Sequence, residues 1–163
     1  MQPTISEGYA PGCIGRIAQL HAAYYSATHG FGAAFEAKVA TELAAFCASY
    51  VKGRDGLWLA NQTSNIEGSI AIDGTHATEH FAHLRWFISS DMLRGKGIGR
   101  ELLSRALAFC DEQRYQRVHL WTFAGLDAAR HLYESHGFRL QHESPGSQWG
   151  TVVREQRFVR EAT

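Results

Sequence analysis

A glycine-rich segment between an apolar run and a helix-period pattern constrains this chain more than any other feature. The apolar run, residues 81–89, is rich in aromatic and aliphatic side chains and predicts a strand. The segment Arg94-Gly95-Lys96-Gly97-Ile98-Gly99 follows after a short polar turn, and from Ile98 onward apolar residues recur at the spacing of one helix face. The sequence therefore predicts a strand–loop–helix unit in which the helix begins within the glycines.

This junction has the chemistry of an anion site. The first N–H groups of a helix lack intrahelical partners and lie at the positive end of the helix dipole. Glycine lets the backbone turn tightly and approach a ligand closely. We therefore expect the junction to bind a phosphate or pyrophosphate, chiefly through backbone N–H groups.

Two familiar phosphate-binding motifs do not match these glycines. A Walker A loop needs a Lys followed by Ser or Thr, whereas Lys96 lies between glycines. A dinucleotide-binding fingerprint, G-x-G-x-x-G, opens a βαβ unit, whereas Gly95, Gly97 and Gly99 are spaced differently and lie in the middle of the chain. The pattern that remains is R/Q-x-x-G-x-G/A, which Arg94, Gly97 and Gly99 match.

Together with a second motif, this pattern resembles the GNAT family of N-acetyltransferases, which transfer an acetyl group from acetyl-CoA. The second motif, residues 128–138, reads A-A-R-H-L-Y-E-S-H-G-F and is similar to the family's A-x-x-L-Y-x-x-x-G-F ending. A helix pattern and a predicted strand at residues 117–122 lie between the two motifs. The resemblance covers roughly residues 82–140 and implies the family's fold.

Length and composition limit the number of domains, the partners and the cellular compartment that are expected. The chain has 163 residues, which suits a single N-acetyltransferase domain over residues 1–163. Sixteen basic and sixteen acidic side chains cancel without long runs of either sign, so we expect neither nucleic acid nor a membrane as a partner. Three cysteines without a C-x-x-C, and a first segment without signal-peptide features, indicate the cytoplasm.

The patterns along the chain predict an α/β (α+β) fold with the order β-α-α-β-β-β-α-β-α-β-β. The resemblance implies a mixed, mostly antiparallel sheet flanked by helices on both faces. Strands are predicted near residues 2–6, 57–60, 66–72, 80–89, 117–122, 139–143 and 151–159, and helices begin near residues 13, 35, 98 and 128.

The resemblance implies acetyl-CoA as the cosubstrate. Its pyrophosphate is expected on the glycine segment, with Lys96 and Arg100 either adding charge or remaining solvated. In the family the preceding strand splays from its neighbour and pairs with the pantetheine arm, and the Ser89 N–H is a candidate donor to the thioester oxygen. The expected cofactor-binding residues are Phe87, Ile88, Ser89, Arg94, Gly95, Lys96, Gly97, Ile98, Gly99, Arg100 and Tyr133.

Tyr133 stands where the resemblance implies a general acid for the CoA thiolate, although a buried aromatic with a structural hydroxyl is the alternative. The chain departs from the family seven residues earlier, where Leu126 replaces a frequent Asn that contacts the cofactor. That contact is either absent or made by Thr122 or another group.

His83 is the candidate general base. It lies eleven residues before Arg94, where the histone-acetylating branch of the family has a catalytic Glu, and an unperturbed His titrates at about pH 6.5. Period two places it on one strand face with Phe81, Arg85 and Phe87. A structural histidine, Glu67, Glu79 or a water chain without a single base are the alternatives.

No metal is expected, because in His76-x-x-x-His80-x-x-His83 the third histidine points away from the first two and no cysteine is near.

The acceptor site is expected between residues 29–33, with Tyr24 and Tyr25, and the loop 144–150 with Trp149. The function predicted is direct acetyl transfer to a primary amine of a small, amino-acid-like molecule. A non-catalytic acyl-CoA sensor or assembly module is the alternative, and a homodimer is common in the family.

Overall fold

Seven strands pair into one mixed sheet in the computed structural model, which describes residues 2–76 and 80–162. The order across the sheet is β1-β2-β3-β4-β5-β7-β6; β4 and β5 are parallel, and the other neighbours are antiparallel. The strands are β1 (Thr4–Glu7), β2 (Gly56–Gln62), β3 (Asn65–Asp73), β4 (Phe81–Ser89), β5 (Arg117–Phe123), β6 (Phe138–Gly146) and β7 (Val153–Glu161). The helices are α1 (Cys13–His29), α2 (Ala33–Ala48), α3 (Ile98–Glu112) and α4 (Asp127–Ser135), with a short 3-10 helix η2 (Asp91–Leu93).

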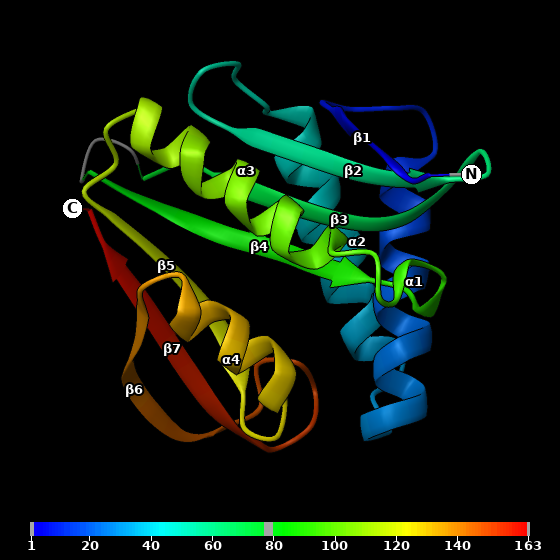
Figure 1. Ribbon diagram of the computed structural model, residues 1–163. Helices are drawn as coiled ribbons and strands as arrows, with labels where there is room; N and C mark the ends of the chain where they lie inside the picture. The colour runs from blue at the N-terminus through cyan, green and yellow to red at the C-terminus, as the bar shows by residue number, and fades with distance from the viewer. Residues whose placement is uncertain (1, 77–79, 163) are drawn as a thin grey trace.

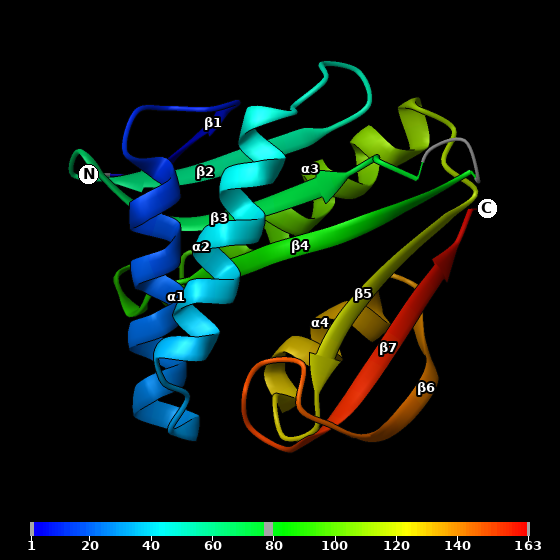
Figure 2. The same cartoon turned by 180° about the vertical axis from the view of Figure 1, so that it is seen from behind.

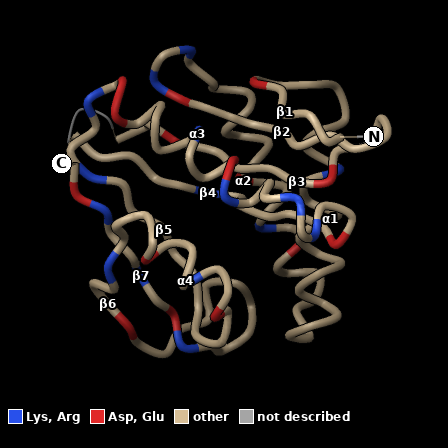
Figure 3. Tube along the Cα trace, viewed as in Figure 1, with Lys and Arg blue, Asp and Glu red and all other residues tan. Residues whose placement is uncertain are grey.

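The element order expected from the sequence is confirmed, with η2 as an addition. The helix predicted to begin within the glycines does so: Gly97 caps α3, and Ile98 is its first residue. Among the described residues, no helix is long and apolar enough to cross a membrane. Basic and acidic side chains are interspersed along the described chain (Figure 3).

Helices cover both faces of the sheet. α1 and α2 lie on one face, and α3 and α4 lie on the other (Figures 1 and 2). Consecutive residues of β2 are buried. Since alternate side chains of a strand point to opposite sides of the sheet, β2 is buried on both faces. Leu57 and Leu59 pack into the core under α1 and α2, whereas Trp58 and Ala60 pack into the core under α3.

The sheet opens between its two parallel strands. Over the described lengths of β4 and β5, pairing is confined to Phe81 with Arg117, Ala82 with Val118, and His83 with His119. Beyond these pairs the strands diverge, and the sheet divides into a half formed by β1 to β4 and a half formed by β5 to β7 (Figures 1 and 2). β5 remains paired with β7 along its full length.

A β-bulge bends β4 at the point where the strands diverge. Trp86 has a φ of 48°, an uncommon conformation for a bulky residue. Opposite it, the register of β3 shifts between Ser69 and Ala71, as expected where one strand carries an extra residue. The Ser69 hydroxyl donates a hydrogen bond of 2.7 Å to the carbonyl of Trp86 and so holds the bulge.

The bulge changes which side chains share a face. Trp86 packs into the core under α1 and α2, whereas Phe87 packs against the core under α3. The prediction that Phe87 shares a face with His83 is therefore wrong, because the extra residue shifts the alternation by one. Phe87 instead faces Gly99, where an added Cβ would lie 3.8 Å from its ring.

Candidate active site

Two cavities open where β4 and β5 diverge. The first, here named the loop groove, has a volume of about 560 Å³ and follows the end of β4 and the starts of α3 and α4. The second, the inner pocket, has a volume of about 180 Å³ and is bounded by α1, α2, β4 and β5. Tyr25, Phe87, Thr122 and Tyr133 line both cavities, so the cavities meet at these side chains.

Backbone groups dominate the glycine side of the loop groove. Gly97 has a φ of 72° and Gly95 a φ of 74°, in the left-handed region that other residues adopt only with strain. Gly97 is the N-cap of α3, so the N–H groups of the next residues have no acceptor within the helix. Gly99, in the first turn, lines the groove. This arrangement can bind an anion without help from a charged side chain.

The structure distributes the predicted cofactor residues unevenly. Six of them line the loop groove: Phe87, Ile88, Ser89, Arg94, Gly99 and Tyr133. Gly95, Lys96, Gly97 and Arg100 belong to the adjoining loop and first helical turn, and are not among the described residues that line the groove. Ile98 has its side chain in the core under α3, so only its backbone can contribute to an anion site.

Sequence reasoning missed the contribution of α4. Leu126, Asp127, Ala128 and Ala129, the cap and first turn of this helix, line the same groove as Gly99. Gly125 precedes them with a φ of 102°. The groove thus lies at two helix N-termini, those of α3 and α4. The backbone at the start of α4 lies next to Leu126, the position where the family often has a cofactor-binding Asn. Gly125 could have indicated this second helix start in the sequence, because it is a glycine just before a predicted helix.

Tyr133 lies in the wall between the two cavities. Only 7% of this residue is exposed, and its ring contacts Phe87 at 6.0 Å and Phe138 at 5.8 Å between centroids. Burial raises the pKa of the Tyr133 phenol, and the nearby Tyr25 raises it further. Burial likewise raises the pKa of Tyr25 to about 12, with a further contribution from Tyr24. Both phenols therefore keep their protons at neutral pH and can act as hydrogen-bond donors.

His83 lines the inner pocket at the last pair before the strands diverge. Its ring stacks on His119 with 4.5 Å between centroids and 21° between planes. Burial lowers the pKa of His83 well below 6.5, and His119 and Arg85 lower it further. Burial, followed by Arg157, lowers the pKa of His119 to about 4. His83 is therefore neutral at pH 7: it can accept a proton, but it is a weak base.

Glu67, an alternative base in the sequence analysis, is hydrogen-bonded to Ser90 and Arg16. Its carboxylate accepts hydrogen bonds from Ser90 Oγ at 2.7 Å and from an Arg16 Nη at 2.9 Å, and it is 7% exposed. It is not among the described residues that line either cavity. The other alternative, Glu79, lies outside the described residues. Glu67 joins α1 to the segment that leads from β4 into the glycine loop.

The described residues contain no cluster of three or more His, Cys, Asp or Glu side chains that could hold a metal ion. Of the three histidines in the spaced motif, His76 stacks on Phe81 at 5.5 Å and His83 stacks on His119.

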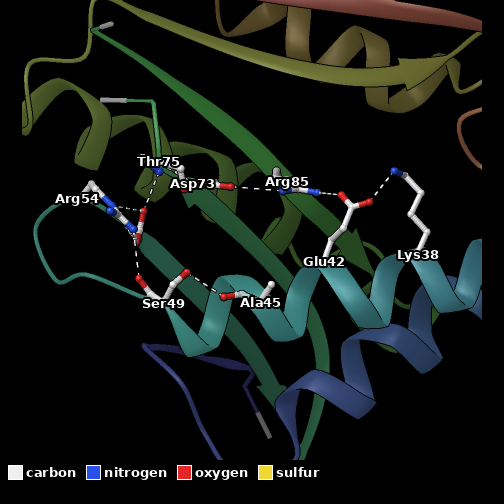
Figure 4. A network of polar contacts seen from close by, with 10 residues as sticks. Lys38, Glu42, Ala45, Ser49, Arg54, Asp73, Thr75 and Arg85 are labelled. Carbon is white, nitrogen blue, oxygen red and sulfur yellow. Dashed lines mark hydrogen bonds and ion pairs between the residues drawn. The ribbon is translucent and has the colours of Figure 1, made fainter. Parts of the chain in front are cut away.

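Charged side chains in the inner pocket were missed by the sequence analysis. Lys38 and Glu42 lie one turn apart on α2, and Glu42 is ion-paired with Arg85 of β4 (Figure 4). Partial burial raises the pKa of Glu42, but Lys38 and Arg85 together outweigh it, so the pKa is lowered and the carboxylate is ionised. The i,i+4 spacing of Lys38 and Glu42 was visible in the sequence, but its partner on β4 was not.

The two segments expected to form an acceptor site meet only in part: Tyr25, from the first segment, lines the inner pocket as well as the loop groove. Gln148 and Trp149, from the second segment, line the inner pocket. From the first segment, His29 and Tyr24 line the loop groove instead, and Phe31 is buried in the core.

A family model described as the acetyltransferase (GNAT) family matches residues 16–138. N-acetylaspartate synthetase from Homo sapiens is 32% identical over 128 residues, which cover 78% of this chain and 42% of that protein. The Rattus norvegicus protein of the same name is 33% identical over 117 residues, with 71% and 39% covered. The chain therefore spans about two fifths of the length of these curated relatives.

Solved structures share the fold over almost the whole chain. An acetyltransferase of the GNAT family from Staphylococcus aureus has a TM-score of 0.77 at 18% identity, with 99% of both chains covered. An acetyltransferase from Streptococcus agalactiae has a TM-score of 0.76 at 18% identity and the same coverage. At this level of identity, the likeness shows the fold alone.

Proposed function

Since this chain belongs to the acetyltransferase (GNAT) family, we propose that it transfers an acetyl group from acetyl-CoA directly to the primary amine of a small, amino-acid-like molecule. The observation that carries the proposal is the meeting of the loop groove and the inner pocket at Tyr133. A cofactor in the groove and an amine in the pocket would face each other across that side chain.

The residues of the loop groove fit acetyl-CoA. The N-termini of α3 and α4 suit a pyrophosphate, because both present N–H groups at the positive end of a helix dipole. The diverging end of β4, Phe87 to Ser89, suits an extended arm with amide groups. The volume of about 560 Å³ falls within the range of roughly 300–1,000 Å³ typical of ligand sites.

Acetyl-CoA supplies an activated thioester when bound. The Ser89 N–H is proposed to stabilise the negative charge that develops on the thioester oxygen. Tyr133 is proposed to donate a hydrogen bond to the sulfur as the C–S bond breaks. A thiol has a pKa of about 8.5 and Tyr133 a raised one, so complete proton transfer is unfavourable and stabilisation by the hydrogen bond is the larger effect.

The attacking amine must lose a proton, since a lysine-like ammonium has a pKa of about 10.4. His83 is the proposed acceptor of that proton, because it is neutral and lines the same pocket as Tyr133. Its lowered pKa limits its strength as a base. Water in the pocket is the alternative acceptor.

A cytoplasmic location and a homodimeric state remain expectations.

The proposal is tested by thermal-shift titration with acetyl-CoA and CoA, followed by CoA release with a panel of amines. Gly99→Trp should lose the stabilisation, because an indole would fill the groove, and Gly15→Trp is a matched control on an open stretch of α1. At a ligand concentration 100 times Kd, binding should stabilise the wild type by about 2.7 kcal/mol. Binding without turnover would favour the sensor alternative, and equal loss in both variants would contradict the assignment of the groove.

A further inference from the structure

We infer that the inner pocket binds an amine acceptor carrying a carboxylate, which Lys38 and Arg85 hold, and that Glu42 competes with this carboxylate for the same two cations. The inference rests on the proposed function, because it names the acceptor class for that site. It assigns specificity to three side chains that line the inner pocket.

The three side chains form a continuous ionic chain between α2 and β4. The Glu42 carboxylate accepts from Lys38 Nζ at 2.5 Å through one oxygen and from Arg85 through the other. Arg85 contacts Asp73 of β3 at 3.3 Å on its far side (Figure 4). Its guanidinium carbon lies 4.2 Å from the centroid of the Trp86 ring. Asp73 and Trp86 thus fix the guanidinium in place, with Glu42 on the side toward α2.

The charge of the pocket wall favours an anionic group. Among the described residues that line the pocket, the ionised side chains are Lys38, Arg85 and Glu42, two cations against one carboxylate. The histidines of the wall add no charge: burial lowers the pKa of His21 to about 4 and that of His83 well below 6.5. An acceptor with a carboxylate therefore complements the two cations of the wall, whereas one that carries only positive charge finds a single carboxylate, Glu42, which is already paired with both cations.

The position of the cations sets the orientation of the acceptor. Tyr133 lines both cavities, whereas Lys38 and Arg85 line the inner pocket alone among the described cavities. An amine placed at Tyr133 would therefore have its carboxylate toward α2. The volume of about 180 Å³ is close to the roughly 150 Å³ of a cavity that holds one benzene, so one small molecule fills it.

Glu42 occupies the place of a competing carboxylate. Its side chain is 34% exposed, as is that of Lys38, so both can turn toward solvent at little cost. An i,i+4 pair of this exposure contributes little to stability. The acceptor carboxylate can then replace Glu42 on Lys38 and Arg85, while Asp73 continues to hold the guanidinium. The name of the curated relatives, N-acetylaspartate synthetase, describes an acylated amine next to carboxylates and agrees with this class.

The test compares kcat/KM for CoA release with alanine, aspartate and phenylalanine against their α-carboxamides. The amine of each amide has the lower pKa, so a larger fraction of it is unprotonated at neutral pH, and a preference for the acid cannot come from a larger supply of free amine. We expect the wild type to prefer the acids at least tenfold, as one charged hydrogen bond allows. Lys38→Gln should reduce the acid-to-amide ratio about tenfold, and Glu42→Gln should raise it several-fold because it removes the competitor.

Arg105→Gln is the matched control, since it breaks another i,i+4 pair, with Glu101 at 2.9 Å on α3, and should keep the wild-type ratio. A ratio that falls in Glu42→Gln would overturn the inference, because it would mean that Glu42 binds the acceptor. Unchanged ratios in both pocket variants would overturn it as well. Turnover of amides but not acids would overturn the inference and leave the proposed function standing. No turnover with any amine, despite stabilisation by acetyl-CoA, would overturn both.

Discussion

The loop groove and the inner pocket share a wall at Tyr133, but they are built from different parts of the chain. The groove presents the backbone of two helix starts and of one strand end. The inner pocket presents side chains from α1, α2, β4 and β5, including an ionic chain. A site built from backbone depends on chain conformation, whereas a site built from side chains depends on residue identity.

The largest effect is expected at the shared wall. Tyr133→Phe should lower kcat about 100-fold, because it removes a hydrogen-bond donor to the charge that develops on the sulfur, and leave the KM for acetyl-CoA nearly unchanged. The measurement is CoA release under saturating acetyl-CoA. Tyr115→Phe is the control: this hydroxyl donates to the Arg54 carbonyl at 2.7 Å, away from both cavities. A rise in KM without a fall in kcat would assign Tyr133 to binding alone.

The next effect concerns a side chain that supports the groove from a distance. Glu67→Ala should lower the free energy of unfolding by about 2 kcal/mol, because charged hydrogen bonds to Arg16 and Ser90 are lost. It should also weaken acetyl-CoA binding, since Glu67 holds the segment leading to the glycine loop. Urea unfolding and thermal-shift titration measure the two effects. In the exposed control Glu101→Ala, the free energy of unfolding should change by less than about 0.5 kcal/mol.

A smaller effect separates backbone from side chain within the groove. Gly97→Ala should weaken acetyl-CoA binding about tenfold. A φ of 72° costs an L-residue roughly 1–2 kcal/mol, so the free loop should leave this conformation and would have to regain it on binding. Ser89→Ala should change binding less than about threefold, because it keeps the N–H and removes only the hydroxyl. The measurement is the Kd for acetyl-CoA of the wild type and both variants, determined by calorimetry. The reverse order would show that the groove recognises its ligand through side chains.

The smallest effect is expected in the pH profile of the inner pocket. Burial places the pKa of His83 well below 6.5, so the imidazole takes up no proton between pH 8 and pH 6.5. kcat/KM for the acceptor should therefore rise steadily with pH as the amine loses its proton, without an inflection near 6.5. An inflection there that disappears in His83→Gln would show that the histidine is more exposed in the working enzyme.

The same difference explains what the sequence could predict. The start of α3 within the glycines was predictable because Arg94, Gly97 and Gly99 encode a backbone conformation within six adjacent residues. The element order was predictable because each helix and strand has its own period. The inner pocket was not, because Glu42 and Arg85 are 43 residues apart and meet only after α2 packs on the sheet.

The error at Phe87 has another origin. Nothing in the residues around Trp86 indicates a bulge, since the segment contains neither Gly nor Pro. The bulge depends on β3, where Ser69 binds the displaced carbonyl. A count of alternating residues along one strand could not include a partner that lies 17 positions away.

The divergence of β4 and β5 has a consequence for association with other chains. A sheet normally has two edges, and each edge offers unpaired backbone groups on which foreign strands can aggregate. By opening in its middle, this sheet gains two further edges, which face each other inside the molecule (Figure 2). Helices lie on both faces of the sheet beside these inner edges (Figures 1 and 2), and the loop groove follows the end of β4. The end of β4 thus presents its backbone inside a cavity, whereas the outer edges of the sheet present theirs at the rim of the molecule.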